Sequence, residues 1–217
     1  MELDLDLDHV RLADRPLVVC DVDDVVLQFI VPFQSYLDSL GHRLVPRSFR
    51  LHGNIVSQAT EAPLPDQEVS DLIEAFFDAQ ETWQTPFSTT AAAIETIARD
   101  ADIVFLTAMP PRFADRRRRL LDTIGFSQPL VATQQPKGPV VETLHAGRPL
   151  PVAFIDDMAH NLVSVGSHVA DCLLLHMVPI SEIHRHAPMA KPPVLRVADW
   201  PEATQHIRRH CGTRETS

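Results

Sequence analysis

Short runs of apolar residues recur along the chain, and each is too short for a helix. The runs are uninterrupted rather than alternating, which is typical of strands that are covered on both faces in a parallel sheet. The strands predicted in this way are Leu17–Cys20, Asp102–Leu106, Leu130–Ala132, Val152–Ile155, Leu173–Val178 and Val194–Val197.

Between these runs, apolar residues recur at helical spacing. A first amphipathic helix is predicted after Leu27 and ends at Gly41, a residue type that commonly terminates helices. Further helices are predicted over residues 90–99, 112–124 and 201–210. Strands that alternate with helices over short connections indicate an α/β fold, a Rossmann-like doubly wound parallel sheet with helices on both faces.

The segment from residue 31 to residue 86 departs from this alternation. It contains no strand-like run, and an amphipathic stripe that includes Val69, Phe76 and Trp83 predicts a second helix. Residues 42–65 have no clear period and are expected to be a loop with a short helix around Ile55. The sequence therefore predicts a sheet domain of residues 1–30 and 87–217, interrupted by a small helical cap of residues 31–86.

The first predicted strand runs directly into acidic residues. Asp21 and Asp23 are separated by one residue, so at a strand end both carboxylates point to the same side. The carboxyl edge of an open α/β sheet is where ligands bind. Two adjacent carboxylates repel each other unless a cation or a proton is added, which favours a hard metal such as Mg²⁺ or one protonated acid. A solvated acidic loop is the alternative.

Three other chain segments place polar residues at positions of the same kind. Thr107 follows the second strand, and Asp156 and Asp157 follow Val152–Ile155. Lys137 is expected on a loop between Pro and Gly, where a side chain is held more firmly than on an open surface. Simple exposure of Lys137 remains the alternative.

The charge balance narrows the possible partners. The 217 residues include 29 acidic and 19 basic side chains, for a formal charge of -10. This balance argues against a nucleic-acid polymer as partner, since such binding depends on clustered Lys and Arg. Small phosphorylated substrates remain compatible with it.

The spacing of the cysteines and the lengths of the apolar runs bear on the cellular compartment of the protein. The three cysteines are far apart in the sequence, which argues against a disulfide framework and favours a reducing environment. No apolar run has the length of a membrane span, and the acidic N-terminus differs from a basic secretory signal. A cytoplasmic protein without a membrane partner is expected.

Several other residues have competing interpretations. The basic run Arg116–Arg119 lies within a predicted helix, and most of it is expected to face solvent rather than to bind phosphate. His184 and His186 are expected to be exposed rather than to form a second metal site, because they lack acidic or cysteine partners at suitable spacing. The acidic residues Asp4, Asp6 and Asp8 indicate a mobile arm or an edge strand.

The cap segment contains residues that are candidates to line a substrate pocket. They are His52, Asn54 and Trp83. The spacing of Trp83 favours packing in the cap core instead, and for His52 the pattern favours neither interpretation.

The ordered set of strand-end residues resembles the four motifs of the haloacid dehalogenase superfamily. The matching residues are the segment Asp21-Val22-Asp23-Asp24-Val25, Thr107, Lys137 before Gly138, and the pair Asp156-Asp157. The resemblance implies a Rossmann-like sheet with a small helical cap, of the C1 type, inserted after the first motif. Asp24 stands where many relatives have Gly.

The resemblance also implies roles for single residues. Asp21 resembles the nucleophile that accepts a phosphoryl group, and Asp23 resembles the general acid and base. Thr107 is expected to bind a phosphoryl oxygen, and Lys137 is expected to offset negative charge.

A magnesium ion is implied by the same resemblance. Its ligands would be the Asp21 carboxylate, the backbone carbonyl of Asp23 and the Asp156 carboxylate, with Asp157 in support. Phosphoryl transfer depends mainly on positioning and charge neutralisation, so this set suits it.

The resulting expectation is an enzyme, a Mg²⁺-dependent phosphomonoester hydrolase acting on a small phosphorylated metabolite such as a nucleotide or sugar phosphate. Asp23 favours phosphatase chemistry, because dehalogenases of this superfamily lack an acid at that position. A phosphomutase of the same superfamily is the first alternative, and a non-catalytic, receiver-like signalling protein is the second. The sequence does not indicate the oligomeric state.

Overall fold

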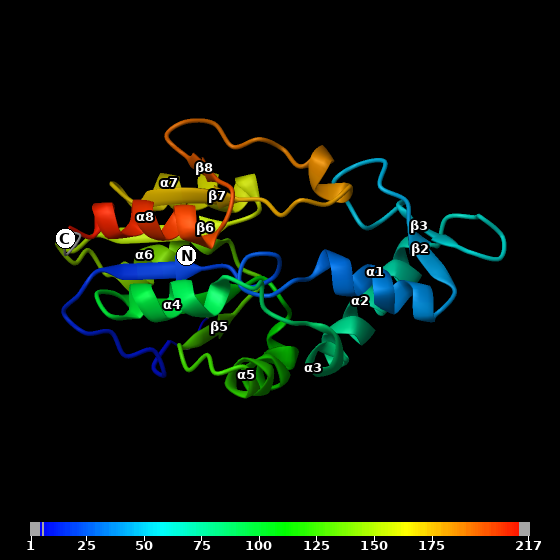
Figure 1. The fold of residues 1–217 in the computed structure, drawn as a ribbon, viewed down its shortest axis with the longest axis horizontal. Coiled ribbons are helices and arrows are strands. Elements are labelled where there is room, and N and C mark those ends of the chain that lie inside the picture. The colour runs from blue at the N-terminus through cyan, green and yellow to red at the C-terminus, as the bar shows by residue number, and fades with distance from the viewer. Residues whose placement is uncertain (1–4, 6, 213–217) are drawn as a thin grey trace.

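The computed structural model describes residue 5 and residues 7–212, which form a sheet domain and a smaller cap (Figure 1). The sheet has six strands in the order β5-β4-β1-β6-β7-β8, and every neighbouring pair is parallel. The strands are β1 (Leu17–Cys20), β4 (Asp102–Thr107), β5 (Leu130–Ala132), β6 (Val152–Asp156), β7 (Leu173–Met177) and β8 (Leu195–Val197). The predicted Rossmann-like α/β class is confirmed.

The apolar character of β1 follows from its central position. Val18 and Cys20 pack into a core on one face of the sheet, and Leu17 and Val19 pack into a second core on the other face. The first core is completed by α4 (Thr90–Ala98), α5 (Ala114–Thr123) and α8 (Trp200–His210). The second is completed by α6 (Lys137–His145) and α7 (Ala159–His168). Because both faces are covered, no position of β1 is polar.

The cap lies to the right of the sheet domain in Figure 1 and has its own apolar core. Its helices are α1 (Ile30–Ser39), α2 (Asp66–Asp78) and α3 (Gln80–Trp83). Phe33, Leu37 and Phe76 are fully buried between them, and the half-buried Trp83 packs against the same core.

The cap also contains a β-hairpin where a loop and a short helix were predicted. Strands β2 (His42–Leu44) and β3 (Ile55–Ser57) pair antiparallel, with Leu44 opposite Ile55. The prediction was wrong because strands of three residues are too short to produce a visible alternation in the sequence.

The two connections between the domains run side by side. The backbone N–H of Gln28 donates to the carbonyl of Thr85 over 2.9 Å, and Leu27 forms an antiparallel bridge with Pro86. The cap therefore leaves and rejoins the sheet domain at a single place, close to the end of β1.

Several predicted boundaries shift in the structure. The helix predicted over residues 112–124 is a short 3₁₀ turn, Pro111–Phe113, followed by α5. Lys137 is the first residue of α6 rather than part of a loop, because the turn before it ends at Pro136. Proline fits naturally just before a helix, since its fixed φ already suits that geometry.

The acidic N-terminal segment lies only partly within the described chain. Asp4 and Asp6 fall outside the described residues, and the described part of residues 1–15 forms no strand. Leu5, Leu7 and Val10 pack against the core that contains α6 and α7. Among the described helices, none combines the length and the apolar composition needed to cross a bilayer.

Candidate active site

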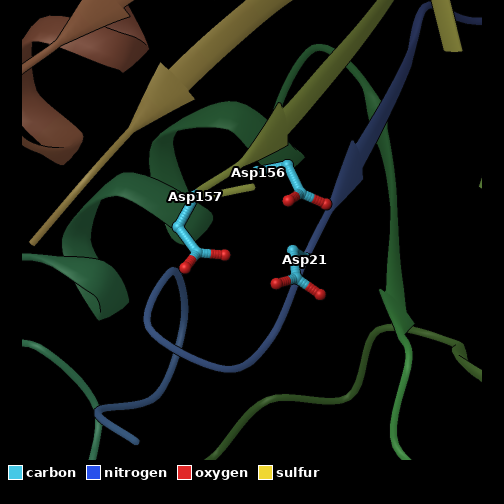
Figure 2. A group of neighbouring side chains, drawn as sticks. All are labelled: Asp21, Asp156 and Asp157. Carbon is cyan, nitrogen blue, oxygen red and sulfur yellow. The ribbon is translucent and has the colours of Figure 1, made fainter. Parts of the chain in front are cut away.

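Three aspartates meet at the carboxyl edge of the sheet. Asp21 follows β1, Asp156 is the last residue of the neighbouring β6, and Asp157 comes next. One carboxylate oxygen from each lies within 4.8 Å of the others, and all three residues are buried. Figure 2 shows the three side chains gathered close together at the ends of the strands. These residues are called the carboxylate cluster below.

Lys137 neutralises part of this cluster. Its Nζ donates to Asp21 Oδ1 over 2.5 Å and to Asp156 Oδ2 over 2.7 Å, and the side chain is buried. The next residue must be glycine, because a Cβ at Gly138 would lie 2.4 Å from the carbonyl oxygen of Ser164. Close packing of α6 against α7 thus brings Lys137 to the sheet edge.

The pKa values of the cluster indicate an excess of negative charge. Burial raises the pKa of Asp21 to about 7; the Lys137 ammonium opposes this rise, whereas Asp156 and Asp23 add to it. The pKa of Asp157 is raised well above its usual value, first by burial and then by Asp156. For Lys137, the two carboxylates outweigh the opposite effect of burial and raise its pKa.

The cluster therefore fits a hard divalent cation. Its donors are carboxylate oxygens, which Mg²⁺ prefers, and one lysine does not balance three buried acids. Asp156 is held in place by the amide of Asn161, which donates to both of its oxygens over 3.1 Å, and by the backbone N–H of Met158 at 2.7 Å.

Asp23 and Thr107 lie beside the cluster. Thr107 is the buried last residue of β4, and its hydroxyl donates to Asp23 Oδ2 over 3.3 Å while accepting from the N–H of Met109. The Asp23 side chain is not one of the clustered carboxylates, which suits the expectation that only its backbone carbonyl would meet the metal. Both residues line the same cavity as Asp21.

That cavity has a volume of about 350 Å³ and lies between the sheet edge and the cap. Asp21, Asp23, Thr107, Lys137 and Asp157 form its polar floor. The cap side is contributed by Phe29, by Phe77 of α2 and by the loop between β2 and β3, at Phe49, Arg50 and Leu51.

The cap residues singled out in the sequence do not line this cavity. The exposed His52 bonds to the Ser70 hydroxyl at 2.9 Å. Asn54 has a structural role instead: its buried amide donates to the carbonyls of Ser48 and Arg50 and so shapes the loop that carries Phe49. Trp83 packs against the cap core, as its spacing favoured, and neither His52 nor Asn54 lines the cavity.

The fold was compared with known proteins. A haloacid dehalogenase-like hydrolase from Streptococcus pneumoniae superimposes with a TM-score of 0.59 at 11% identity, covering 89% of this chain and 98% of the other. A proposed β-phosphoglucomutase from Thermotoga maritima gives 0.58 at 14% identity, with 89% and 99% coverage. An L-2-haloacid dehalogenase from Xanthobacter autotrophicus gives 0.57 at 11% identity, with 88% and 98% coverage.

The chain has the haloacid dehalogenase fold. No protein-family model and no curated protein sequence matches it. The superimposed proteins carry different activities in their descriptions, so the haloacid dehalogenase fold leaves the reaction of this chain open.

A buried arginine, Arg117, lies beside Asp23. Arg117 of α5 is fully buried, and its Nη2 donates to Asp23 Oδ1 over 2.9 Å and to Gln84 Oε1 over 3.0 Å. Its Nε donates to Gln80, which, like Gln84, is buried at the end of the cap. Arg117 therefore connects Asp23 to the segment that rejoins the sheet domain.

Most of the basic run was predicted to face solvent, and Arg117 is the member that is buried instead. This residue shares the buried stripe of its helix with Phe113, Leu120 and Leu121, at spacings of four, three and four residues. That spacing was visible in the sequence, and it distinguishes Arg117 from its exposed neighbour Arg119.

Asp24 adopts a backbone conformation that usually favours glycine. Its φ is 60°, and its carboxylate accepts from the N–H of Phe29 at 2.8 Å and of Ile30 at 3.2 Å. Aspartate tolerates this region better than most residues, and here it also satisfies the first N–H groups of α1. Burial raises the pKa of Asp24 to about 7, against the opposing effect of those two N–H donors.

His184 is buried, in contrast to the predicted exposure. It lies in the short 3₁₀ helix Ile183–His186, and its Nε2 is 3.6 Å from carboxylate oxygens of both Asp24 and Asp157. Burial lowers the pKa of His184 to about 4, so the ring is neutral at pH 7. No sequence signal marks this histidine, since its partners come from other parts of the chain.

Proposed function

We propose that this chain is a Mg²⁺-dependent phosphomonoester hydrolase that acts through a phosphoryl group carried on Asp21. The main support is the position of Lys137, whose ammonium bridges Asp21 and Asp156 inside a buried group of acids at the floor of the cavity. Lys137 places positive charge beside Asp21, and a bound Mg²⁺ would add to it, which is what attack on a phosphoryl group requires.

The residues present suit both halves of the reaction. Asp21 attacks phosphorus while the bond to the leaving oxygen breaks, and Asp23 donates a proton to that oxygen. A water molecule then attacks phosphorus, the bond to Asp21 breaks, and Asp23 takes the proton from the water. Lys137 holds Asp21 in position, and the Thr107 hydroxyl lies beside Asp23 to bind a phosphoryl oxygen.

Asp21, Asp156 and Asp157 are the residues that would hold Mg²⁺. The bound ion would offset the negative charge of the phosphoryl oxygens and allow Asp21 to remain ionised.

Asp23 is the reason to prefer an ester substrate over a haloacid. A halide leaves without a proton, whereas the alkoxide of a phosphate ester needs one. The Asp23 carboxylate lines the cavity next to Thr107 and keeps a partly exposed side chain, so it can reach a leaving oxygen.

Phosphate release from simple esters tests the proposal. The full chain, freed of metal and given Mg²⁺, is expected to release inorganic phosphate from 4-nitrophenyl phosphate, and excess chelator is expected to stop the release. A matched exchange of the exposed Asp115→Asn is expected to change nothing. A phosphomutase would instead convert one sugar phosphate into another without net release, and no turnover of any phosphate ester would contradict the proposal.

A further inference from the structure

The wall of the cavity differs in chemistry from its floor. Three phenylalanine rings from separate segments line it, namely Phe29 before α1, Phe49 of the cap loop and Phe77 of α2. Apolar side chains from other segments complete the surface that is called the apolar wall below: Ile30, Leu51, Met109 and Ile183. Phe29 and Phe77 pack against each other with ring centroids 5.7 Å apart.

Several polar side chains in the cavity already have partners within the protein. The Asp24 carboxylate accepts the first N–H groups of α1. The amide of Asn161 donates to Asp156, and His184 Nδ1 bonds to the Ser181 hydroxyl at 2.7 Å. These groups are therefore not free to bind the organic part of a substrate.

Beyond the catalytic set, two side chains along the cavity remain for that purpose. Arg50 and His160 are both exposed, and neither side chain has a hydrogen bond or ion pair with the described part of the chain. A sugar ring carries several hydroxyl groups, and each one buried against the apolar wall without a partner would weaken binding. Two polar groups cannot satisfy such a ring, whereas three aromatic rings suit a flat apolar group.

We propose that the substrate is a phosphomonoester of an aromatic or similarly flat, apolar alcohol, with its ring against Phe29, Phe49 and Phe77. This inference rests on the proposed function, since the phosphoryl group must lie over Asp21 for the organic group to reach the apolar wall. It excludes the polyhydroxylated sugar phosphates from the preferred substrates.

Esters of simple primary alcohols separate recognition of the ring from reactivity of the leaving group. Benzyl phosphate, ethyl phosphate and glucose 6-phosphate all release a primary alcohol, so the chemical step is similar. With Mg²⁺ and the full chain, kcat/KM for benzyl phosphate is expected to exceed each of the other two by about tenfold or more. A preference for glucose 6-phosphate, or equal values for benzyl and ethyl phosphate, would overturn the inference.

A variant in the cap loop tests the position of the ring. Phe49→Ala is expected to lower the ratio of kcat/KM values for benzyl and ethyl phosphate by about fivefold to tenfold, mainly through KM for the benzyl ester. Arg47→Ala is the matched control, because Arg47 is exposed on the same loop and does not line the cavity. The Arg47 variant is expected to keep the wild-type ratio. An unchanged ratio in the Phe49 variant would contradict the assigned wall.

Binding without turnover distinguishes failure of this inference from failure of the proposed function. Benzylphosphonate is expected to bind about tenfold more tightly than methylphosphonate in calorimetry with Mg²⁺ present. Tight benzylphosphonate binding without hydrolysis of any ester would support the apolar wall and refute the hydrolase. Hydrolysis of all esters with equal affinity for both phosphonates would support the hydrolase and refute the wall.

Discussion

The floor and the wall of the cavity are built on opposite physical principles. The floor contains Lys137 and two acids of the carboxylate cluster, and the third, Asp156, lies at the same sheet edge and also bonds to Lys137. The wall is apolar and comes from the cap and from loops, with the Phe49 ring resting on the His184 ring at a centroid distance of 5.5 Å. The two surfaces therefore serve different tasks. The charged floor serves the reaction, whereas the apolar wall can select a substrate without altering the reacting groups.

The largest effect is expected from the floor, at the residue proposed to carry the phosphoryl group. Asp21→Asn removes the attacking carboxylate and keeps the size of the side chain, so phosphate release should fall by about a thousandfold or more. Phosphate release and circular dichroism are measured together, the second to show that the fold is retained. Normal turnover in a correctly folded variant would show that Asp21 is not the nucleophile.

A Lys137 variant tests whether the positive charge of this side chain stabilises the buried carboxylates at the floor of the cavity. Lys137→Met leaves Asp21 and Asp156 buried without their common partner, so activity should fall by about a hundredfold and stability by about 3 kcal/mol. Urea denaturation in the presence of a chelator measures the stability, and phosphate release measures the activity.

The control for this variant is the other lysine of the chain. Lys191 is exposed, and Lys191→Met is expected to leave both quantities unchanged. Equal losses in the two lysine variants would show that the effect is not specific to the carboxylate cluster.

Arg117 lies between the floor of the cavity and the cap. Replacing it is expected to cause a smaller loss of activity than replacing Lys137. Arg117→Met removes one of the two buried donors to Asp23 Oδ1, the other being the Gln84 amide, and leaves Gln80 and Gln84 without their own donor. Turnover should fall by about tenfold, because Asp23 loses its charged donor and is oriented less firmly by the remaining donors, Gln84 and Thr107. Arg119→Met is the comparison, since the exposed Arg119 pairs with Glu81 on the surface and should be neutral. A wild-type kcat in the Arg117 variant would show that Arg117 does not orient Asp23 for the reaction.

The last expected effect is on stability rather than on turnover, and it comes from the bound ion itself. Mg²⁺ at about 100 times its dissociation constant should stabilise the chain by about 2.7 kcal/mol, because it binds the folded state alone. Differential scanning fluorimetry over a Mg²⁺ series should show a rising Tm for the wild type and a much smaller rise for Asp156→Asn. Equal rises in both would place the ion elsewhere.

More of the floor than of the wall could be predicted from the sequence, because the floor residues belong to local patterns. A carboxylate at the end of a buried strand is a local pattern, so Asp21 and Asp156 could be placed on one edge before any coordinates. Lys137 was placed in a loop, yet its side chain reaches the same edge from the start of α6.

The contacts that were missed join distant parts of the chain. Phe49 lies on a loop shaped by Asn54, and the buried His184 lies beside Asp24 and Asp157. Arg117 was the exception, since its place on an apolar stripe could have been recognised within its own helix. Local periodicity predicts which residues are buried, but it does not predict which residues of another segment they meet.

The most direct test of the central claim is to locate the phosphoryl group on the chain. The full chain is mixed with Mg²⁺ and excess 4-nitrophenyl phosphate, quenched in acid during turnover, digested and mapped by mass spectrometry. The account predicts an acid-stable phosphoryl adduct on the peptide that contains Asp21, absent from the Asp21→Asn variant. Active turnover with no adduct at Asp21, or with the adduct on another residue, would contradict it.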